Sequence, residues 1–362
     1  MQTRLILLGA GKIGEAILNL LSHTGDYLIT VADADAQRLA QVDEMGFADV
    51  TTRLADVGDP AVLASLIDGH KVTLSACPYF LTPAIAAAAG AAGSHYFDLT
   101  EDVASTQVVK KLAARAGTAF VPQCGLAPGF ISIVANDLAG RFDSLRDVQM
   151  RVGALPIYPS NALKYNLTWS TDGLINEYCN SCEAIVDGQL RETSPLEEIE
   201  HFSLDGIDYE AFNTSGGLGT LCDSLQGKVA NLNYKTVRYP GHRDIVKMLV
   251  RDLQLGQPER RHILKEVLEA SIPMTRQDVV LVFVSVCGMR GGRLEQESYA
   301  KKIYSQTVNG ELLSAIQLTT AAGICAMVDL LVHGKLPQKG LVRQEDTALI
   351  DFLGNRFCRH YA

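Results

Sequence analysis

A glycine-rich turn near the start of the chain constrains its fold more than any other feature. The run Gly9-Ala10-Gly11-Lys12-Ile13-Gly14 follows four apolar residues, 5–8, and precedes another apolar stretch, 16–18. A G-x-G-x-x-G run between a strand and a helix is the fingerprint of a dinucleotide site. Its first glycine permits the tight turn, its second lets the backbone approach a pyrophosphate, and its third lets the helix pack closely on the strand. We therefore expect Gly9, Gly11, Lys12, Ile13 and Gly14 to hold the phosphates of a cofactor at a helix N-terminus.

An acidic residue indicates which dinucleotide binds. Asp33 follows the apolar run 27–32 and lies 19 residues after Gly14. A carboxylate at this place binds the ribose 2′-hydroxyl of NAD and repels the 2′-phosphate of NADP. Neither Ala34 nor Asp35 offers a positive charge for such a phosphate. The sequence therefore predicts NAD, with NADP as the weaker alternative.

Length and charge limit the class of protein. A chain of 362 residues predicts about two domains, and its hydrophobic content of 47% is ample for their cores. The net charge of −9 argues against nucleic acid or an anionic membrane surface as a partner. We find no run of roughly 18 apolar residues that would span a membrane, and the first apolar run is too short for a secretory signal. We expect a cytoplasmic enzyme that acts on small molecules.

The first 123 residues alternate strand-like and helix-like segments. Strands are expected at 5–8, 27–32, 71–77, 95–99 and 118–122, with helices at 12–22, 36–45, 60–68, 82–92 and 104–116. This alternation predicts an α/β fold with a doubly wound parallel sheet of the Rossmann type, in which ligands bind beyond the carboxyl ends of the strands. We therefore expect Asp56 and Val57 near the adenine, and Cys77, Pro78 and Tyr79 near the nicotinamide.

The pattern changes after residue 129. Segments 148–152 and 279–286 are strand-like, and the second continues through a Gly-rich turn to Tyr304. This pattern of strand-like segments predicts an α+β domain with a mostly antiparallel sheet. An apolar helix near 319–332 and a short helix near 352–357 are expected to pack on the nucleotide domain. The predicted domains are residues 1–127 with about 318–362, which bind the cofactor, and residues 128–317, which bind the substrate and form a dimer.

The cysteines do not indicate a metal site. Eight cysteines lie mostly in apolar segments and are expected to be buried thiols of a reducing compartment. Cys179 and Cys182 have C-x-x-C spacing, but no second pair or histidine pair lies at the spacing of zinc ligands. The sequence therefore predicts no metal.

Five segments, spread over essentially the whole chain, resemble those of the saccharopine dehydrogenase-like oxidoreductases. They are the glycine turn, 124–129 (Cys-Gly-Leu-Ala-Pro-Gly), 152–156 (Val-Gly-Ala-Leu-Pro), 210–214 (Glu-Ala-Phe-Asn-Thr) and 238–242 (Arg-Tyr-Pro-Gly-His). The last three are more specific than the glycine turn. Within the family the motifs are most similar to those of lysine 6-dehydrogenases, except that Ser215 stands where we expect an aspartate.

The resemblance implies hydride transfer from a carbon that bears nitrogen to a nicotinamide, giving an imine that water then opens. In lysine 6-dehydrogenases this carbon is Cε of lysine, and the products are allysine and ammonia. In saccharopine dehydrogenases and reductases the nitrogen joins lysine to a dicarboxylate skeleton. We expect a small amino-acid substrate and a homodimer or higher homo-oligomer.

Oxidation of an amine requires a neutral nitrogen and therefore a general base. His242 is the first choice, because histidine titrates near neutral pH; its alternative role is to cap the helix that follows. Arg238 is expected to hold the α-carboxylate of the substrate through a two-pronged hydrogen-bonded pair. Asn213 and Thr214 are expected to orient the substrate or to cap a turn, and Tyr165 to line the pocket or to fill the core.

Two further candidates end predicted parallel strands on the cofactor side. Asp98 could activate water or stabilise the positive charge of the imine, or it could cap a helix. Cys124 could form a covalent intermediate, as in aldehyde-oxidising enzymes, or it could be a buried thiol that shapes the pocket, which we favour. The alternatives to an amine dehydrogenase are therefore a semialdehyde dehydrogenase that uses Cys124 and a non-catalytic redox sensor that binds NAD(H).

Overall fold

The computed structural model describes residues 2–361, which form two compact units. Unit 1 contains the residues up to Gly129, residues Thr307–Glu311 and the residues from Gln317 onward. Unit 2 contains Phe130–Gln306 and Leu312–Ile316. Unit 1 is thus assembled from both ends of the chain.

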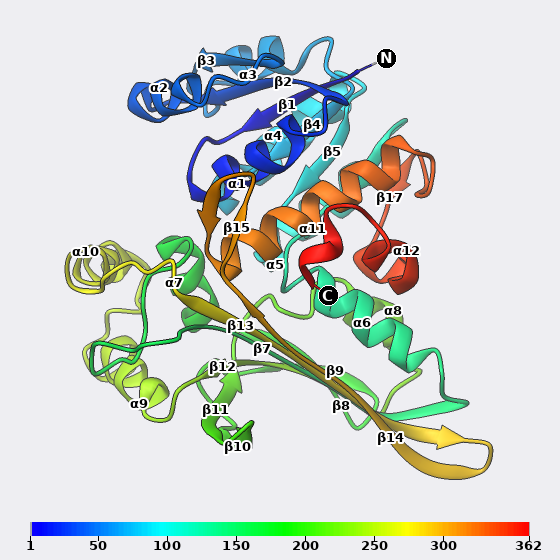
Figure 1. Cartoon of the computed structure of the whole chain (residues 1–362). Helices are drawn as coiled ribbons and strands as arrows, with labels where there is room; N and C mark the ends of the chain where they lie inside the picture. The colour runs from blue at the N-terminus through cyan, green and yellow to red at the C-terminus, as the bar shows by residue number, and fades with distance from the viewer. Residues whose placement is uncertain (1, 362) are drawn as a thin grey trace. The chain divides into compact units, whose positions relative to one another are not determined.

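Unit 1 is built on a doubly wound parallel sheet (Figure 1). Its seven strands run in the order β17-β6-β5-β4-β1-β2-β3, and every pairing is parallel. The strands β1 to β6 span Thr3–Leu8, Tyr27–Asp33, Val50–Leu54, Val72–Ser75, His95–Asp98 and Ala119–Val121, and β17 spans Gly340–Leu341. The strand order reverses between β1 and β4, so a ligand crevice is expected at their carboxyl ends. The Rossmann-type sheet predicted from the sequence is confirmed.

Helices cover this sheet. The helices α1 to α5 span Lys12–Ser22, Ala36–Glu44, Pro60–Ile67, Thr82–Ala91 and Val103–Ala113; α11 and α12 span Ala315–Val332 and Leu349–Leu353; short 3₁₀ turns span Tyr79–Leu81, Gln344–Asp346 and Cys358–Tyr361. Residues of α3, α4 and α5 pack with Ile6 and Leu8 of β1 into one core cluster. Leu5 and Leu7 point to the other face of the sheet and are also buried. β1 is therefore covered on both faces, as its continuous apolar sequence requires.

The helix α11 is more apolar than the sequence analysis allowed. Among the helices of the described residues, α11 is the one whose length and composition would allow it to cross a membrane, with a mean hydropathy of 1.8 over 18 residues. However, 78% of this helix is buried within the protein. Asp329 near its end accepts hydrogen bonds from the Tyr27 hydroxyl at 2.9 Å and from Arg356 at 2.6 Å. These contacts and this burial are those of a core helix.

Unit 2 is built on a mixed sheet of eight strands. Six run in the order β10-β11-β12-β7-β13-β14, and β8 pairs with β12 and β9. The strands β7 to β14 span Ser144–Pro156, Cys182–Val186, Gln189–Thr193, Glu200–Leu204, Ile207–Asn213, Asn231–Arg238, Asp278–Arg290 and Arg293–Tyr304. Only β7 and β12 pair in parallel; the other described pairings of this sheet are antiparallel. The predicted mostly antiparallel sheet is confirmed. A separate pair, β15 and β16, spans Gln306–Val308 and Glu311–Leu313.

The two faces of the unit 2 sheet have different neighbours. The helices α6 to α10 span Phe130–Ala139, Thr171–Cys179, Leu221–Leu225, His242–Lys247 and Arg261–Ser271, with further short helical turns at Met248–Asp252 and Pro258–Arg260. Residues of α7, α9 and α10 pack with Phe212 of β11, which shares a face with Arg238. Val237 of β12 points to the other face and packs with Leu155 and Leu281. We call these two surfaces the Arg238 face and, after Asn213 of β11, the Asn213 face.

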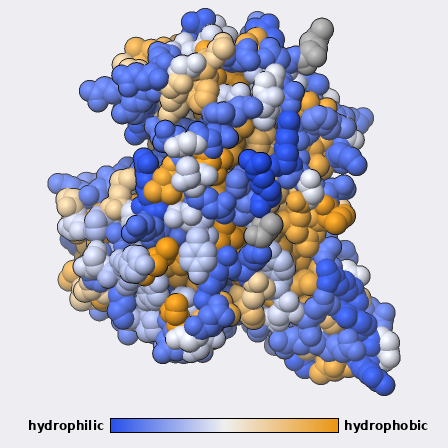
Figure 2. Space-filling view, viewed as in Figure 1, coloured by the Kyte–Doolittle hydropathy of each residue, from blue (hydrophilic) through white to orange (hydrophobic). Residues whose placement is uncertain are grey.

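The strands β13 and β14 form a long hairpin (Figure 1). Figure 2 shows mainly hydrophilic residues at the end of this hairpin, at the lower right. The edge strand β14 carries Arg293, Glu295, Glu297, Lys301 and Lys302. Charged side chains along an edge strand disfavour pairing with a strand of another molecule.

Candidate functional site

The glycine turn after β1 has the geometry that a dinucleotide needs. Gly9 has a φ of +100°, and a Cβ there would lie 2.8 Å from the carbonyl oxygen of Ala76. A Cβ at Gly14 would lie 2.0 Å from the carbonyl oxygen of Gly9, so only glycine lets α1 approach β1 this closely. A Cβ at Gly11 would come within 4 Å only of the Arg38 guanidinium, at 3.4 Å. The turn and the first residues of α1, Lys12 and Ile13, therefore fit a pyrophosphate.

Asp33 at the end of β2 is tied to the glycine turn. Its Oδ2 accepts a hydrogen bond from the backbone amide of Ala10 at 2.7 Å, and its Oδ1 accepts one from the amide of Asp35 at 2.8 Å. Arg38 of α2 places a guanidinium nitrogen 3.9 Å from Oδ2. Arg38 is a source of positive charge that the two residues directly after β2, Ala34 and Asp35, do not reveal. The signal was available, because the first turn of a helix that starts at Ala36 brings residue 38 back toward the end of β2.

The other predicted cofactor residues differ in exposure. Asp56 is exposed, and its carboxylate accepts a hydrogen bond from the amide of Gly58 at 2.8 Å. Val57 is a member of the core cluster beneath α3 and α4, so its side chain does not line the crevice. Cys77, Pro78 and Tyr79 follow β4 and are partly or fully exposed. Burial, with a smaller contribution from Asp33, raises the pKa of Cys77 to about 12.

Asp98 and Cys124 are buried at the carboxyl ends of β5 and β6. Oδ1 of Asp98 accepts hydrogen bonds from the amides of Thr100 at 3.0 Å and Gln123 at 2.8 Å, which tie the two strand ends together. Burial raises the pKa of Asp98 to about 6, although these two amides oppose the shift.

The environment of the Cys124 thiol is unsuited to a nucleophile. Its Sγ donates to the carbonyl oxygen of Val121 at 3.0 Å and accepts from Nε2 of Gln344 at 3.2 Å. Burial, and then the charge of Asp98, hold the pKa of this thiol well above its usual value. Because the thiolate is the reactive form, a thiol in this state is inert.

In unit 2, Arg238 and His242 are joined through a tyrosine that the sequence analysis missed. The hydroxyl of Tyr178, on α7, accepts a hydrogen bond from Nε of Arg238 at 3.1 Å and lies 3.0 Å from Nε2 of His242. Nδ1 of His242 lies 2.8 Å from the carbonyl oxygen of Leu163. A carbonyl can only accept, so we assign the imidazole proton to Nδ1, and Nε2 accepts from the Tyr178 hydroxyl. Hydrogen bonds therefore run from Arg238 through Tyr178 and His242 to Leu163.

This arrangement determines the charges of the two predicted residues. Burial, and then the charge of Arg238, lower the pKa of His242 to about 3. Burial also lowers the pKa of Arg238, but Tyr178, Tyr165 and Glu177 together raise it by more, so the guanidinium stays charged. His242 is neutral at physiological pH with both ring nitrogens engaged. Such an imidazole is better suited to orienting Tyr178 than to accepting a proton from a substrate.

Tyr165 lies beside Arg238, and Thr214 is bonded to a residue of the same strand face. The guanidinium carbon of Arg238 is 4.9 Å from the centroid of the Tyr165 ring, and this ring meets the His242 ring edge-on at 5.3 Å. Oγ1 of Thr214 is 2.7 Å from Oγ1 of Thr236, which points to the same face of β12 as Arg238. The structure thus brings four of the predicted residues, Arg238, His242, Tyr165 and Thr214, to the Arg238 face.

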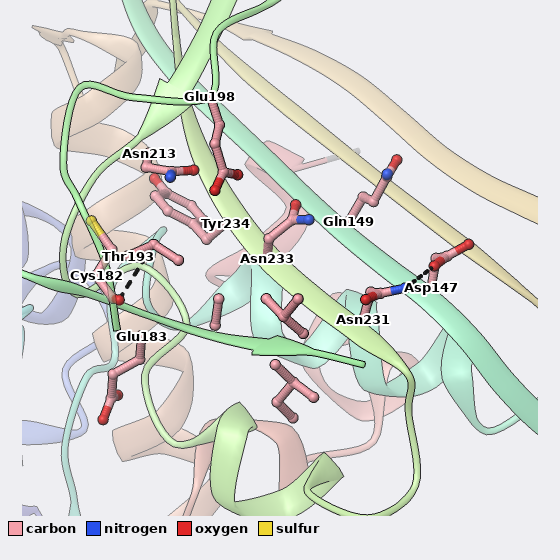
Figure 3. Close-up of a pocket in the computed structure, with 13 residues that line it drawn as sticks. Asp147, Gln149, Cys182, Glu183, Thr193, Glu198, Asn213, Asn231, Asn233 and Tyr234 are labelled. Carbon is pink, nitrogen blue, oxygen red and sulfur yellow. Dashed lines mark hydrogen bonds between the residues drawn. The ribbon is translucent and has the colours of Figure 1, made fainter. Parts of the chain in front are cut away.

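Asn213 lies apart from this group. The register of β11 and β12 pairs Glu210 with Arg238 and Asn213 with Lys235, so Asn213 and Arg238 point to opposite faces of the sheet. Asn213 lines a cavity of about 290 Å³ together with Asn233, Glu198 and Tyr234 (Figure 3). One small substrate cannot contact both Asn213 and Arg238 across the sheet. The sequence motifs alone could not predict that Asn213 and Arg238 lie on opposite faces. Adjacent residues of a strand alternate between faces, and the register between the two strands was unknown.

The described part of the chain offers no evident metal centre. Within residues 2–361, no group of three or more His, Cys, Asp or Glu side chains could hold a metal ion. Cys179 and Cys182 are free thiols, and burial raises the pKa of both.

Two family models match the chain, one over each part of it. Residues 5–121 match the saccharopine dehydrogenase NADP binding domain. Residues 125–354 match the saccharopine dehydrogenase C-terminal domain. The chain belongs to the saccharopine dehydrogenase family. This confirms the resemblance seen in the glycine turn and in the motifs of the second domain.

Curated relatives of this family member are named saccharopine dehydrogenase [NADP(+), L-glutamate-forming]. The protein from Schizosaccharomyces pombe is 25% identical over 202 residues, which cover 54% of this chain and 45% of the relative. The protein from Saccharomyces cerevisiae is 24% identical over 266 residues, which cover 69% of this chain and 58% of the relative. The matched part thus spans about half the length of these relatives. Their names include NADP, so a preference of this chain for NAD is not established by likeness.

The fold is shared with a solved member of the family. The apo saccharopine dehydrogenase (L-Glu forming) from Saccharomyces cerevisiae superposes with a TM-score of 0.76 and 16% identity, over 96% of this chain and 95% of that one. At this identity the likeness concerns the fold alone, and it confirms the predicted α/β architecture.

Proposed function

We propose that this saccharopine dehydrogenase family member is an NAD-dependent amino-acid dehydrogenase that oxidises the carbon bearing the ε-nitrogen of lysine, releasing allysine and ammonia. The observation that carries the choice of lysine is the set of buried cations in unit 2. Among the described residues these are Arg151, Lys235 and Arg238. Arg151 and Lys235 both bind Glu200 on the Asn213 face, at 2.8 and 2.7 Å. Arg238 is then the one buried cation on its own face, which suits a substrate with a single carboxylate.

The residues around Arg238 support recognition of an α-carboxylate. The guanidinium is fixed by the Tyr165 ring and by the Tyr178 hydroxyl. A planar, oriented guanidinium binds a carboxylate through two parallel hydrogen bonds. When bound, the nicotinamide cofactor accepts the hydride. We propose that Arg238 anchors the amino-acid end of lysine so that its ε-carbon is the part left free to react.

His242 takes a positioning role in this proposal, and not the role of general base expected from the sequence. A base of pKa about 3 is too weak to deprotonate an ammonium of pKa ~10.4. Instead His242 orients the Tyr178 hydroxyl, which contacts Arg238. The reactive neutral amine is then drawn from solution, and its fraction increases toward alkaline pH.

The preference for NAD rests on the carboxylate of Asp33 at the end of β2, which repels a 2′-phosphate. Two observations oppose it: Arg38 lies beside Asp33, and the matched relatives are named for NADP. Half of the Arg38 side chain surface is exposed, and the guanidinium already pairs with Asp35 at 3.4 Å. We therefore propose NAD as the better cofactor, with NADP as the alternative.

A saccharopine dehydrogenase or reductase is the second candidate, favoured by the names of the matched relatives. Saccharopine carries three carboxylates, so this function requires cations beyond Arg238. A semialdehyde dehydrogenase is less well supported, because the Cys124 thiol is buried and neutral. A non-catalytic NAD(H) sensor would leave the buried Arg238–Tyr178–His242 arrangement without a role.

One experiment separates these candidates. The purified protein is incubated at about pH 9 with lysine or saccharopine, each with NAD and with NADP, and absorbance at the wavelength of the reduced cofactor is followed. We expect reduction with lysine and NAD, together with the cyclised form of allysine. Turnover with saccharopine alone would assign the second candidate, and cofactor binding without any turnover would assign the sensor.

We also propose that the protein is a cytoplasmic homodimer or higher homo-oligomer whose second unit contributes the interface. Light scattering coupled to gel filtration tests the oligomeric state; a monomer at micromolar concentration would refute it. Fractionation of the source cells tests the location.

A further inference from the structure

Three unsatisfied polar atoms gather near the carboxyl end of β5. Among the described residues, the Tyr96 hydroxyl, Oδ2 of Asp98 and Oε1 of Glu101 are buried without a hydrogen-bond partner. Asp98 is 1% exposed. Its Oδ1 accepts hydrogen bonds from two backbone amides, whereas the donor beside Oδ2 is the Tyr96 hydroxyl, which is close enough to lower the pKa of Asp98 but makes no well-formed hydrogen bond. Buried oxygens without a partner are costly and rare in folded proteins, so Oε1 of Glu101, which lies within the influence of the Asp98 charge, points to an absent donor, proton or cation.

The position of these carboxyl groups in unit 1 indicates what that partner is. Asp33 marks the adenosine end of the cofactor at β2, and the glycine turn marks the pyrophosphate at β1. A dinucleotide that continues in the same direction across the sheet places its nicotinamide half beyond β4 and β5, because the strand order is β5-β4-β1-β2. Asp98 ends β5, and Glu101 lies in the turn before α5. The pair therefore lies on the nicotinamide side of the crevice.

The groups around the pair are acidic or neutral. Glu101 is influenced by the charges of Asp102 and Asp98, and Asp98 by the hydroxyl of Tyr96. The thiols of Cys124 and Cys77, which follow β6 and β4, lie in the same region. The charge of Asp98 raises the pKa of Cys124, and Cys77 contributes to the raised pKa of Tyr96. No cation appears among these influences. Burial, opposed by backbone hydrogen bonds, raises the pKa of Asp98 to about 6; burial and then the two neighbouring aspartates raise that of Glu101 to about 7.

We propose that Asp98 and Glu101 form a carboxyl pair that senses the charge of the nicotinamide ring: the pair keeps a proton beside the neutral reduced ring and releases it when the cationic oxidised ring binds. The charge balance is simple. The oxidised ring brings one positive charge and the pair loses one proton to solvent, so the local charge is unchanged. This inference rests on the cofactor part of the proposed function and not on the identity of the substrate.

The direction of the pH dependence follows from linkage. A nearby positive ring lowers the pKa of both carboxyl groups, so binding of NAD requires deprotonation when the pH is below about 6 to 7. The affinity for NAD therefore falls as the pH falls through this window, by up to about tenfold per pH unit for each proton released. A neutral reduced ring has no such effect. The ratio of the two affinities should thus depend on pH.

The experiment is isothermal titration calorimetry of NAD and NADH from about pH 5.5 to about pH 8.5, with each pH repeated in two buffers of different ionisation enthalpy to count protons. We expect the Kd of NAD to rise about tenfold from pH 8 to pH 5.5, with proton release near pH 6.5, while the Kd of NADH changes less than about twofold. NADP and NADPH replace this pair if they bind more tightly.

Two variants and one control test the assignment. D98N keeps an Oδ1 that can accept both backbone amides, and E101Q keeps the size of Glu101; each should flatten the pH dependence of NAD binding. The control is E44Q, which replaces an exposed glutamate at the end of α2 and should not change the pH dependence of NAD binding. The inference is overturned if wild-type NAD and NADH share one pH dependence, or if D98N and E101Q both behave as wild type. Absence of binding at every pH would overturn the proposed cofactor as well. Failure of the carboxyl-pair inference alone is thereby distinguished from failure of the cofactor assignment.

Discussion

Arg238 is the residue on which the proposed choice of substrate depends. Its guanidinium is fixed by an aromatic ring and a hydroxyl, a geometry that the point charge of lysine cannot reproduce. We expect R238K to lower kcat/KM for lysine about 10- to 100-fold, mainly through KM, because a charged hydrogen bond is worth about 1.5–3 kcal/mol. Steady-state kinetics measures this. The matched control is R151K, an equally buried arginine on the Asn213 face, which should leave KM unchanged; an equal effect of both variants would show that the loss is structural.

The pH dependence of turnover tests the role of His242. Because burial and Arg238 lower its pKa to about 3, the imidazole stays neutral throughout the range from pH 5 to pH 10. At saturating cofactor, kcat/KM for lysine should therefore rise toward the amine pKa of ~10.4 without a break near 6.5. H242N should lower the rate without changing the shape of this profile. A break near 6.5 in the wild type that disappears in H242N would make His242 the general base.

In the proposed function, the choice between NAD and NADP depends on two opposed charges, Asp33 and Arg38. Replacing the carboxylate removes the repulsion of a 2′-phosphate and leaves the guanidinium, which lies 3.9 Å from it, free to pair with that phosphate. We expect D33S to shift the ratio of NADP to NAD affinity about 10- to 100-fold toward NADP, and R38A to reverse part of this shift in the double variant. Fluorescence titration with both reduced cofactors measures the ratio, and an unchanged ratio in D33S would refute the role of Asp33.

At the scale of elements, the sequence predicted what local patterns encode. The bounds of α1, β2 and α4 lie within one residue of the prediction. β3 was missed, because Thr51, Arg53 and Leu54 are exposed on an edge strand and show no apolar run. Tyr178 and Glu101 were missed for a different reason. Their importance comes from neighbours that only the tertiary structure supplies, namely Arg238 with His242 and Asp98.

One cap joins the start of β13 to the start of α11, which is distant from it in sequence. Asp278, fully buried at the start of β13, accepts hydrogen bonds from the amides of Ala315 at 2.5 Å and Ile316 at 3.1 Å, the first residues of α11. We expect D278A to lower the free energy of unfolding by about 1–3 kcal/mol, because it removes a helix cap and leaves buried amides unpaired. Urea denaturation followed by circular dichroism measures this loss. D252A, at an exposed aspartate, is the control; equal stabilities would show that the cap contributes nothing.

At the scale of the whole molecule, the chain returns to the unit in which it began. β17 pairs with β6 at one edge of the parallel sheet, and Asp329 of α11 is bound by Tyr27 of β2 and by Arg356. The sequence predicts C-terminal helices on the nucleotide domain, but it does not predict a strand that joins the sheet of this domain. Two residues, Gly340 and Leu341, are too short a segment to be recognised as a strand by periodicity.

This connectivity leads to a prediction about the response to the cofactor. A ligand that binds only the folded state stabilises the cooperative unit that contains its site, by about 2.7 kcal/mol at 100 times its Kd. Each unit has its own core cluster. NAD should therefore slow the hydrogen exchange that requires global opening only for amides of unit 1. Mass spectrometry should find added protection in β1 and also in α11 after Gln317, far along the chain. The strand β12 of unit 2 is the internal control. Equal added protection of β12 would mean that both units unfold as one, and unchanged exchange in α11 would mean that the C-terminal segment is not part of the unit that binds the cofactor.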